Sequence, residues 1–187
     1  QYNGTDYRFN PRKGMDLNLT LTGGIRKLLK NNSITTLKKD QQNNAFDFAA
    51  LYDTMTLSAA QFRINMKVDQ FIQLGHNATI RSGLQAGWIN GKKLFLNELF
   101  QLGGIKTLRG FDEESFYASE YAIATVEYRY LIGGTSYLFS FLDAAHIGRK
   151  SIQGNLQGKY AGVGVGLAME TKSGLFSLAY AAGKNKD

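Results

Sequence analysis

Apolar and polar residues alternate strictly in Met15-Asp16-Leu17-Asn18-Leu19-Thr20-Leu21-Thr22. The same period of two recurs in residues 60–69, 78–88, 161–169 and 176–180. Because successive side chains of a β-strand point to opposite faces, each segment predicts a strand with one apolar and one polar face. The chain is therefore expected to be all-β and, because tight turns join its strands, antiparallel.

Turn-forming residues divide the chain into its expected strands. We expect strands at residues 14–28, 58–73, 77–90, 118–132, 135–147, 159–171 and 174–182, with a partial strand at 1–8. Tight turns are expected at residues 10–14, 74–76, 133–134 and 172–174, and longer connections at 29–57, 91–117 and 148–158. The strands run about 9 to 16 residues, longer than the roughly five or six typical of soluble proteins and sufficient for a tilted membrane strand.

Short turns at one side and long loops at the other are typical of outer-membrane barrels, which turn their apolar face to lipid and keep a polar lumen. Charged residues near the strand centres make up the expected polar face: Asp16, Arg26, Arg63, Lys67, Asp69, Arg81, Glu127, Arg129 and Glu170. The pattern also fits a soluble antiparallel domain with a charged outer face, but such a domain gives less reason for consistently long strands. A transmembrane β-barrel is the preferred interpretation.

Aromatic residues gather near the ends of the expected strands, where membrane barrels carry interfacial girdles. The residues concerned are Phe71, Trp88, Tyr128, Tyr130 and Tyr137. We expect these rings to lie at the two lipid–water interfaces.

Composition excludes several classes of function. The 187 residues include 22 Lys and Arg against 15 Asp and Glu, a net charge of +7, but the basic residues are spread along the chain, which argues against a nucleic-acid partner. With no Cys, the chain has no disulfide, thiolate metal site or Cys nucleophile, and its 2 His leave little for a zinc site. No apolar run is long enough for a membrane helix. The chain begins at Gln1 without a signal peptide, so a fragment or trimmed mature segment is expected.

The segment 91–117 breaks the strand pattern. A connection of this length within a compact β domain is usually functional or disordered. This one is too apolar to be disordered. Its apolar residues are Leu94, Phe95, Leu96, Leu99, Phe100, Leu102, Ile105, Leu108, Phe111 and Phe116. We therefore expect it to pack, and a large barrel offers its own lumen for this.

A family resemblance starts in this segment. Gly103-Gly104-Ile105-Lys106-Thr107-Leu108-Arg109-Gly110-Phe111 resembles the loop motif of the BamA/TamA/FhaC superfamily, the bacterial surface antigen barrels. Glu127 and Asp143 match the acidic residues of the two strands that follow the loop. Asp6 followed by Asn10-Pro11-Arg12-Lys13-Gly14 resembles a recurrent turn of the family. The resemblance covers nearly the whole chain.

The resemblance implies an antiparallel transmembrane β-barrel of about 16 strands, of which this chain supplies about seven to eight. Residues 1–187 would form the C-terminal portion of the barrel domain, with periplasmic POTRA domains upstream and the final strand outside the chain. The loop at 91–117 would fold back into the lumen.

The resemblance also implies the site. The functional loop motif is Leu108, Arg109, Gly110 and Phe111, and Arg109 would contact Glu127 and Asp143 on the luminal wall. Phe139 and Phe141 share the face of Asp143, and we expect their rings to pack against Phe111.

The implied function is the noncovalent insertion or secretion of polypeptides at the bacterial outer membrane, with outer-membrane lipid and a client polypeptide as partners. One alternative is the membrane anchor of a patatin-like lipase, whose chemistry would lie upstream of Gln1, and another is a passive porin. We expect no enzyme in this chain, with no catalytic, cofactor-binding or metal residues. The acids Asp112-Glu113-Glu114 point in different directions, and Ser115 and Ser119 have no His at a plausible spacing.

Overall fold

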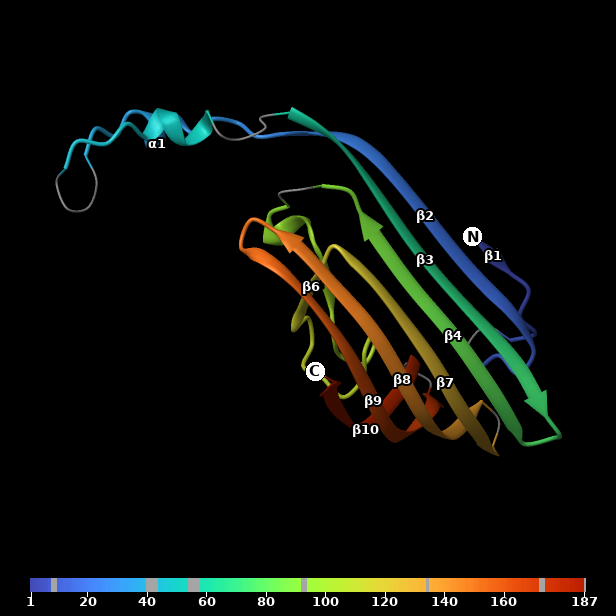
Figure 1. The fold of residues 1–187 in the computed structure, drawn as a ribbon. Coiled ribbons are helices and arrows are strands. Elements are labelled where there is room, and N and C mark those ends of the chain that lie inside the picture. The colour runs from blue at the N-terminus through green and yellow to red at the C-terminus, as the bar shows by residue number, and fades with distance from the viewer. Residues whose placement is uncertain are drawn as a thin grey trace. The chain divides into compact units, whose positions relative to one another are not determined.

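The computed structural model describes residues 1–7, 10–39, 44–53, 58–91, 94–133, 135–171 and 174–186. Within these ranges the chain forms an eight-stranded sheet in the order β1-β2-β3-β4-β7-β8-β9-β10 and a two-stranded sheet of β5 and β6 (Figure 1). The predicted all-β, antiparallel class is confirmed. None of the helices described is long and apolar enough to cross a membrane.

The large sheet contains β1 (Tyr2–Asn3), β2 (Gly14–Lys27), β3 (Ser58–Leu74), β4 (Ala78–Ile89), β7 (Glu120–Gly133), β8 (Ser136–Ser151), β9 (Gly154–Thr171) and β10 (Gly174–Lys186). The small sheet contains β5 (Phe100–Leu102) and β6 (Phe116–Ala118). The short helices are α1 (Asn32–Thr35), η1 (Phe48–Tyr52) and η2 (Leu96–Glu98).

Two compact units divide the chain, residues 1–21 together with 63–187, and residues 22–62. The second unit holds the adjoining ends of β2 and β3 with α1 and η1. Inside it the ring of Phe46 packs edge-on against Phe48, with centroids 4.8 Å apart. Some predicted segments lie in part outside the described residues: residues 40–43 and 54–57 of the loop at 29–57, Arg8 of the partial strand at 1–8, and Lys92-Lys93, Gly134 and Lys172-Ser173 of the other connections.

One predicted connection is wrong. Residues 148–158 are not a long loop, because β8 runs to Ser151 and β9 starts at Gly154 directly opposite it. The connection is the two-residue turn Ile152-Gln153. The strand ends on either side are rich in Gly and polar residues, so they lack the alternation on which the prediction depends. Backbone pairing needs no apolar side chains and continues to the turn.

The two faces of the sheet are inverted relative to a soluble domain. On β7 Glu127 is 3% exposed, whereas the neighbouring Val126 is 54% exposed. Thr125 and Arg129 share the buried face with Glu127, and Tyr128 and Tyr130 share the exposed face with Val126. Charged groups are thus buried and apolar groups exposed, which is the reverse of the usual arrangement in water-soluble proteins. It is the arrangement expected where the apolar face meets lipid.

The predicted aromatic girdle is partly wrong. Trp88, Tyr128 and Tyr130 lie on the exposed face, but Phe71 and Tyr137 are buried. Both buried rings lie against the guanidinium of Arg129, at 5.3 Å and 4.8 Å from centroid to Cζ. Their strand parity places them on the charged face, where the apolar rings cover an arginine rather than meeting an interface.

The long connection between β4 and β7 packs on the buried face of the sheet. Its residues Leu99, Phe100, Leu102 and Leu108 form one apolar cluster with wall residues of β7 and β8. The wall residues are Tyr121, Ile123, Ala145 and Ile147. In Figure 1 this yellow-green segment, which contains β6, lies along one face of β7 to β9.

Candidate functional site

The tip of the long connection is a tight, glycine-rich turn. The Thr107 hydroxyl donates to the carbonyl of Gly103 and accepts from its N–H, both at 2.8 Å. The Gly104 N–H donates to the Phe111 carbonyl at 3.2 Å and closes the turn. Gly103, Gly104 and Gly110 all have positive φ, from +84° to +115°, a conformation that glycine adopts without a Cβ penalty. The closed turn presents Arg109 to the sheet.

Arg109 grips Asp143 of β8 with two parallel hydrogen bonds. Its Nε donates to Oδ2 at 2.8 Å and its Nη2 donates to Oδ1 at 2.7 Å. The Arg109 backbone N–H adds a bond to Oδ2 at 3.2 Å, and Thr125 donates its hydroxyl to Oδ1 at 2.8 Å. Asp143 is 0% exposed, so its charge depends on these donors in place of water.

The third guanidinium nitrogen of Arg109 reaches a second carboxylate. Nη1 donates to Oε2 of Glu127 on β7 at 2.5 Å. The plane of the group lies over the Phe141 ring, with Cζ 3.5 Å from the centroid. Burial lowers the pKa of the Arg109 guanidinium, but the hydrogen bonds to Asp143 and Glu127 outweigh burial and hold the pKa above its ordinary value. Arg109 therefore stays charged at every accessible pH.

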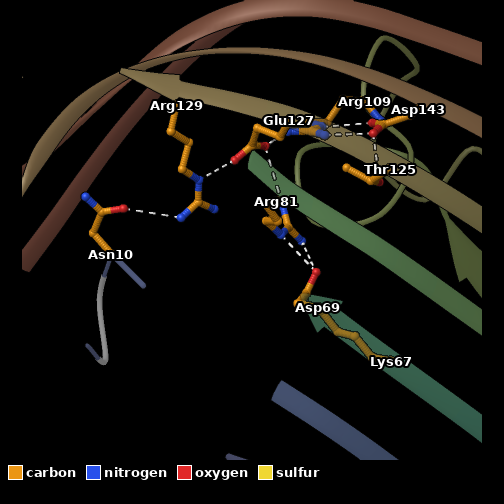
Figure 2. A network of polar contacts seen from close by, with 9 residues as sticks. All are labelled: Asn10, Lys67, Asp69, Arg81, Arg109, Thr125, Glu127, Arg129 and Asp143. Atoms are coloured by element: carbon orange, nitrogen blue, oxygen red, sulfur yellow. Dashed lines mark hydrogen bonds and ion pairs between the residues drawn. The ribbon is translucent and has the colours of Figure 1, made fainter. Parts of the chain in front are cut away.

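The ion pairs continue across the sheet (Figure 2). Glu127 also receives Arg129 Nε at 2.8 Å and faces Arg81 Nη1 at 3.5 Å. Arg81 in turn donates Nε to Asp69 of β3 at 2.8 Å. The arginines Arg81, Arg109 and Arg129 face the carboxylates of Asp69, Glu127 and Asp143, so the formal charges of these six residues cancel (3 − 3 = 0). The half-exposed Lys67 lies 3.8 Å from Asp69 at the edge of this network.

Glycines on β9 and β10 make room for the tip of the loop. A Cβ built on Gly162 would lie 2.0 Å from the Arg109 carbonyl oxygen, and one on Gly183 would lie 2.4 Å from the Gly110 carbonyl oxygen. Gly110 itself faces the backbone of Ala182 and Gly183 at 2.6 to 2.8 Å from an added Cβ. The backbone of the loop thus lies directly on the backbone of the sheet, which only glycine permits.

A comparison with protein families matches residues 1–187 to the Omp85 superfamily domain. The chain belongs to the Omp85 superfamily. This family, which includes the BamA, TamA and FhaC barrels, is one of bacterial outer-membrane proteins that insert or translocate polypeptides, and its members work with POTRA domains and polypeptide clients. Among curated proteins no match to the chain was found.

The structure brings together the residues that the resemblance to the Omp85 barrels implied. Arg109 contacts both Glu127 and Asp143, and Leu108 is fully buried in the apolar cluster. Phe111 has other neighbours than expected. Its ring packs edge-on against Phe116 and Tyr160, at centroid distances of 5.2 Å and 5.7 Å.

Phe139 and Phe141, the expected neighbours of Phe111, lie over glycines of the wall instead. Added Cβ atoms on Gly166 and Gly164 would lie 2.3 Å and 2.7 Å from their rings. The two rings are 6.2 Å apart, and Phe141 forms the floor beneath Arg109. Of the three alternating glycines on β9, Gly162 is the one whose nearest neighbour belongs to the loop.

The alternation along the strands predicts Asp69, Arg81 and Arg129 on the polar face, but it does not assign them to the site. Their strand parity carried the signal, since all three share the face of Glu127. Asn10, whose side chain accepts a bond from Arg129 at 3.3 Å, carried no such signal because it lies in a connection. Among the residues described, no group of three or more His, Asp or Glu is placed to hold a metal ion.

Proposed function

We propose that this chain is the C-terminal portion of an outer-membrane barrel that inserts or translocates client polypeptides. On this proposal the charged face of the sheet lines the lumen and the apolar face meets outer-membrane lipid. The family supports the class of function, and the exposed Val126 beside the buried Glu127 supports the orientation of the wall. The mechanism is noncovalent, and the chain acts without catalytic residues, cofactors or nucleic acid.

The observation that carries the proposal is the anchoring of the long loop by Arg109. A buried carboxylate pair with a forked guanidinium fixes the loop tip at one position on the wall. Fork geometry gives orientation as well as attraction. On this proposal a loop fixed against the luminal wall obstructs free diffusion, which argues against a passive porin and suits a barrel that handles a polypeptide.

The partners of the proposed machine are those with which members of the family work. Client polypeptide and POTRA domains act at the periplasmic side, and the apolar face carries outer-membrane lipid. The chemistry of a patatin-like lipase, if one accompanies the barrel, would lie outside this chain.

The test replaces Arg109 in the full-length protein. Removing one partner of a buried pair costs about 3–5 kcal/mol, so Arg109→Ala is expected to free the loop and impair client insertion or secretion. Arg109→Lys should rescue only in part, because an ammonium cannot fork onto Asp143 while also reaching Glu127. Protease access to the loop and client handling in reconstituted vesicles are the two measurements.

Lys106→Ala is the matched control. Lys106 is an exposed cation of the same loop, so its loss should change neither measurement. Normal client handling by Arg109→Ala with a freed loop would remove the proposed role of the anchor. Steady, large ion conductance without any client-dependent activity in the unmodified protein would favour the porin instead.

A further inference from the structure

A second segment reaches the buried face, from the opposite end of β7. It is the connection between β1 and β2, whose base is closed by Asp6. The Asp6 Oδ1 accepts the backbone N–H groups of Tyr7, Arg12 and Lys13 at 3.0, 2.9 and 3.1 Å. The Asp6 N–H donates to the Lys13 carbonyl at 3.1 Å and extends the strand pairing. A single carboxylate therefore holds the two arms of the connection together.

Asn10 stands at the tip of this connection and is 4% exposed. Its Nδ2 donates to the carbonyl of Thr135, in the turn between β7 and β8, at 3.4 Å. Its Oδ1 accepts from Nη1 of Arg129 at 3.3 Å. Pro11 follows directly and confines the backbone of Asn10 to extended conformations. The amide is thus held from both sides at the end of β7 that lies away from the loop.

Arg129 connects Asn10 to the loop anchor through Glu127. Its Nε donates to Oε1 of Glu127 at 2.8 Å, and the other oxygen of the same carboxylate receives Arg109 at 2.5 Å. Figure 2 shows the side chains in sequence from Asn10 through Arg129 and Glu127 to Arg109. The rings of Phe71 and Tyr137 enclose the Arg129 guanidinium, so its position is set by few partners.

The orientation of Glu127 depends on this chain of contacts. Three guanidinium groups converge on its carboxylate, those of Arg81, Arg109 and Arg129. Without the Asn10 oxygen, Nη1 of Arg129 would be a buried donor that has lost its acceptor, which is costly in a poorly solvated place. The guanidinium would turn toward another acceptor, and Glu127 would follow because its Oε1 is bonded to Arg129.

We propose that Asn10 is a positioning residue for the loop anchor. It holds Arg129, and through it Glu127, in the orientation that receives Arg109. The β1–β2 connection at one end of the sheet and the long loop entering from the other end are thereby coupled through the buried face. The functional consequence rests on the proposed role of the loop, so docking of the loop and client handling are measured separately.

The experiment measures amide hydrogen exchange of residues 104–111 in the full-length protein in lipid vesicles. Asn10→Ala is expected to speed exchange about tenfold, the size that couplings within one side-chain network commonly reach. Asn10→Asp keeps the acceptor for Arg129 but loses the donor to Thr135, and should restore slow exchange. Asn77→Ala is the matched control, since it removes an exposed amide from the β3–β4 turn at the same end of the sheet.

The second arm tests the route through Glu127. In a Glu127→Gln background, Asn10→Ala should add nothing further to the exchange rate. Exchange at the unmodified rate in Asn10→Ala, additive effects of the two changes, or failure of Asn10→Asp to rescue would each overturn the proposal. If Asn10→Ala does not assemble, Arg129→Lys tests the same coupling, because lysine can pair with Glu127 but has no second nitrogen to reach Asn10. Unchanged loop exchange in Arg129→Lys would also overturn the proposal.

A normal client-handling rate in a variant with faster loop exchange would leave the coupling intact and count against the proposed function alone.

Discussion

Gly162→Ala should undock the loop although no charged residue is replaced. Gly162 pairs with Asp143 across the β8–β9 ladder, and its added Cβ would lie 2.0 Å from the carbonyl oxygen of Arg109. Ordinary contact begins at 3.4 Å, so the tip must retreat by about 1.4 Å (3.4 − 2.0 = 1.4). The sheet itself loses nothing, since alanine is a better strand residue than glycine.

That retreat is enough to break the anchor. The Arg109 bonds to Asp143 are 2.7 and 2.8 Å long, and lifting the tip from the same wall by about 1.4 Å carries them to about 4.1 and 4.2 Å, beyond hydrogen-bonding range. Removing one partner of a buried pair costs about 3–5 kcal/mol, which sets the upper limit for the loss of this contact. At about 1.36 kcal/mol per factor of ten, the docking equilibrium shifts by up to roughly 160- to 5,000-fold toward the undocked loop.

The assay is amide exchange or limited proteolysis of residues 94–118 in the full-length protein. Gly24→Ala is the control, because an added Cβ there meets no atom within 4 Å. Exchange in Gly162→Ala equal to that of the unmodified protein would refute the close backbone packing and the dependence of the anchor on it.

Three other predictions test the surroundings of the site. Leu142 on β8 is 56% exposed and should meet lipid, so Leu142→Arg should cost about 2–4 kcal/mol near the bilayer midplane. The fraction of protein assembled in outer-membrane preparations should fall, and unchanged assembly would place that face in water. Burial raises the pKa of the Asp6 carboxyl, but the hydrogen bonds from the backbone N–H groups of Lys13 and Arg12 outweigh burial and hold the pKa below its ordinary value of 3.8. The ionised carboxylate therefore stabilises the closed turn fully at pH values above 3.8, and this stabilisation is lost as the pH falls through the lowered pKa. Protection factors at Arg12 and Lys13 should fall in that range, and Asp6→Asn should remove the pH dependence. An epitope tag within residues 31–44 should be reachable on intact cells; a tag shielded until the membrane is broken would reverse the orientation.

The loop anchor could be proposed from the sequence because strand parity is a strong constraint. A period of two assigns Glu127 and Asp143 to faces without any knowledge of the fold, and one slip in register would move either to the other face. Arg109 has no such constraint in an irregular loop, so its pairing came from the family resemblance. The structure supplies the fork, the Thr125 hydroxyl and the glycine contacts that complete the arrangement.

Other parts could not be predicted for physical reasons. Asn10 lies in a connection, and its burial depends on the Asp6 carboxylate closing the turn and on the Thr135 carbonyl, neither of which a local pattern records. Tyr137 was expected at an interface because it is aromatic and near a strand end. Its position in the alternation of the strand points inward, and in the structure its ring covers the guanidinium of Arg129. The alternation therefore predicts its place better than its aromatic character does.

The position of the anchor is a property of the sheet register as much as of the loop. Directly opposed residues form one row across five strands, in the order Gly83, Thr125, Asp143, Gly162 and Gly183. This row places the hydroxyl of Thr125 on one side of the Asp143 carboxylate. On the other side it places Gly162 and Gly183, where the backbone of the loop lies on the sheet. A two-residue shift between β8 and β9 would keep every face correct but put Tyr160 or Gly164 opposite Asp143, and the first would fill the place of the Arg109 backbone. A loop docked at Asp143 is therefore incompatible with the shift that brings Tyr160 opposite that residue, so docking constrains the pairing of β8 with β9 as well as depending on it.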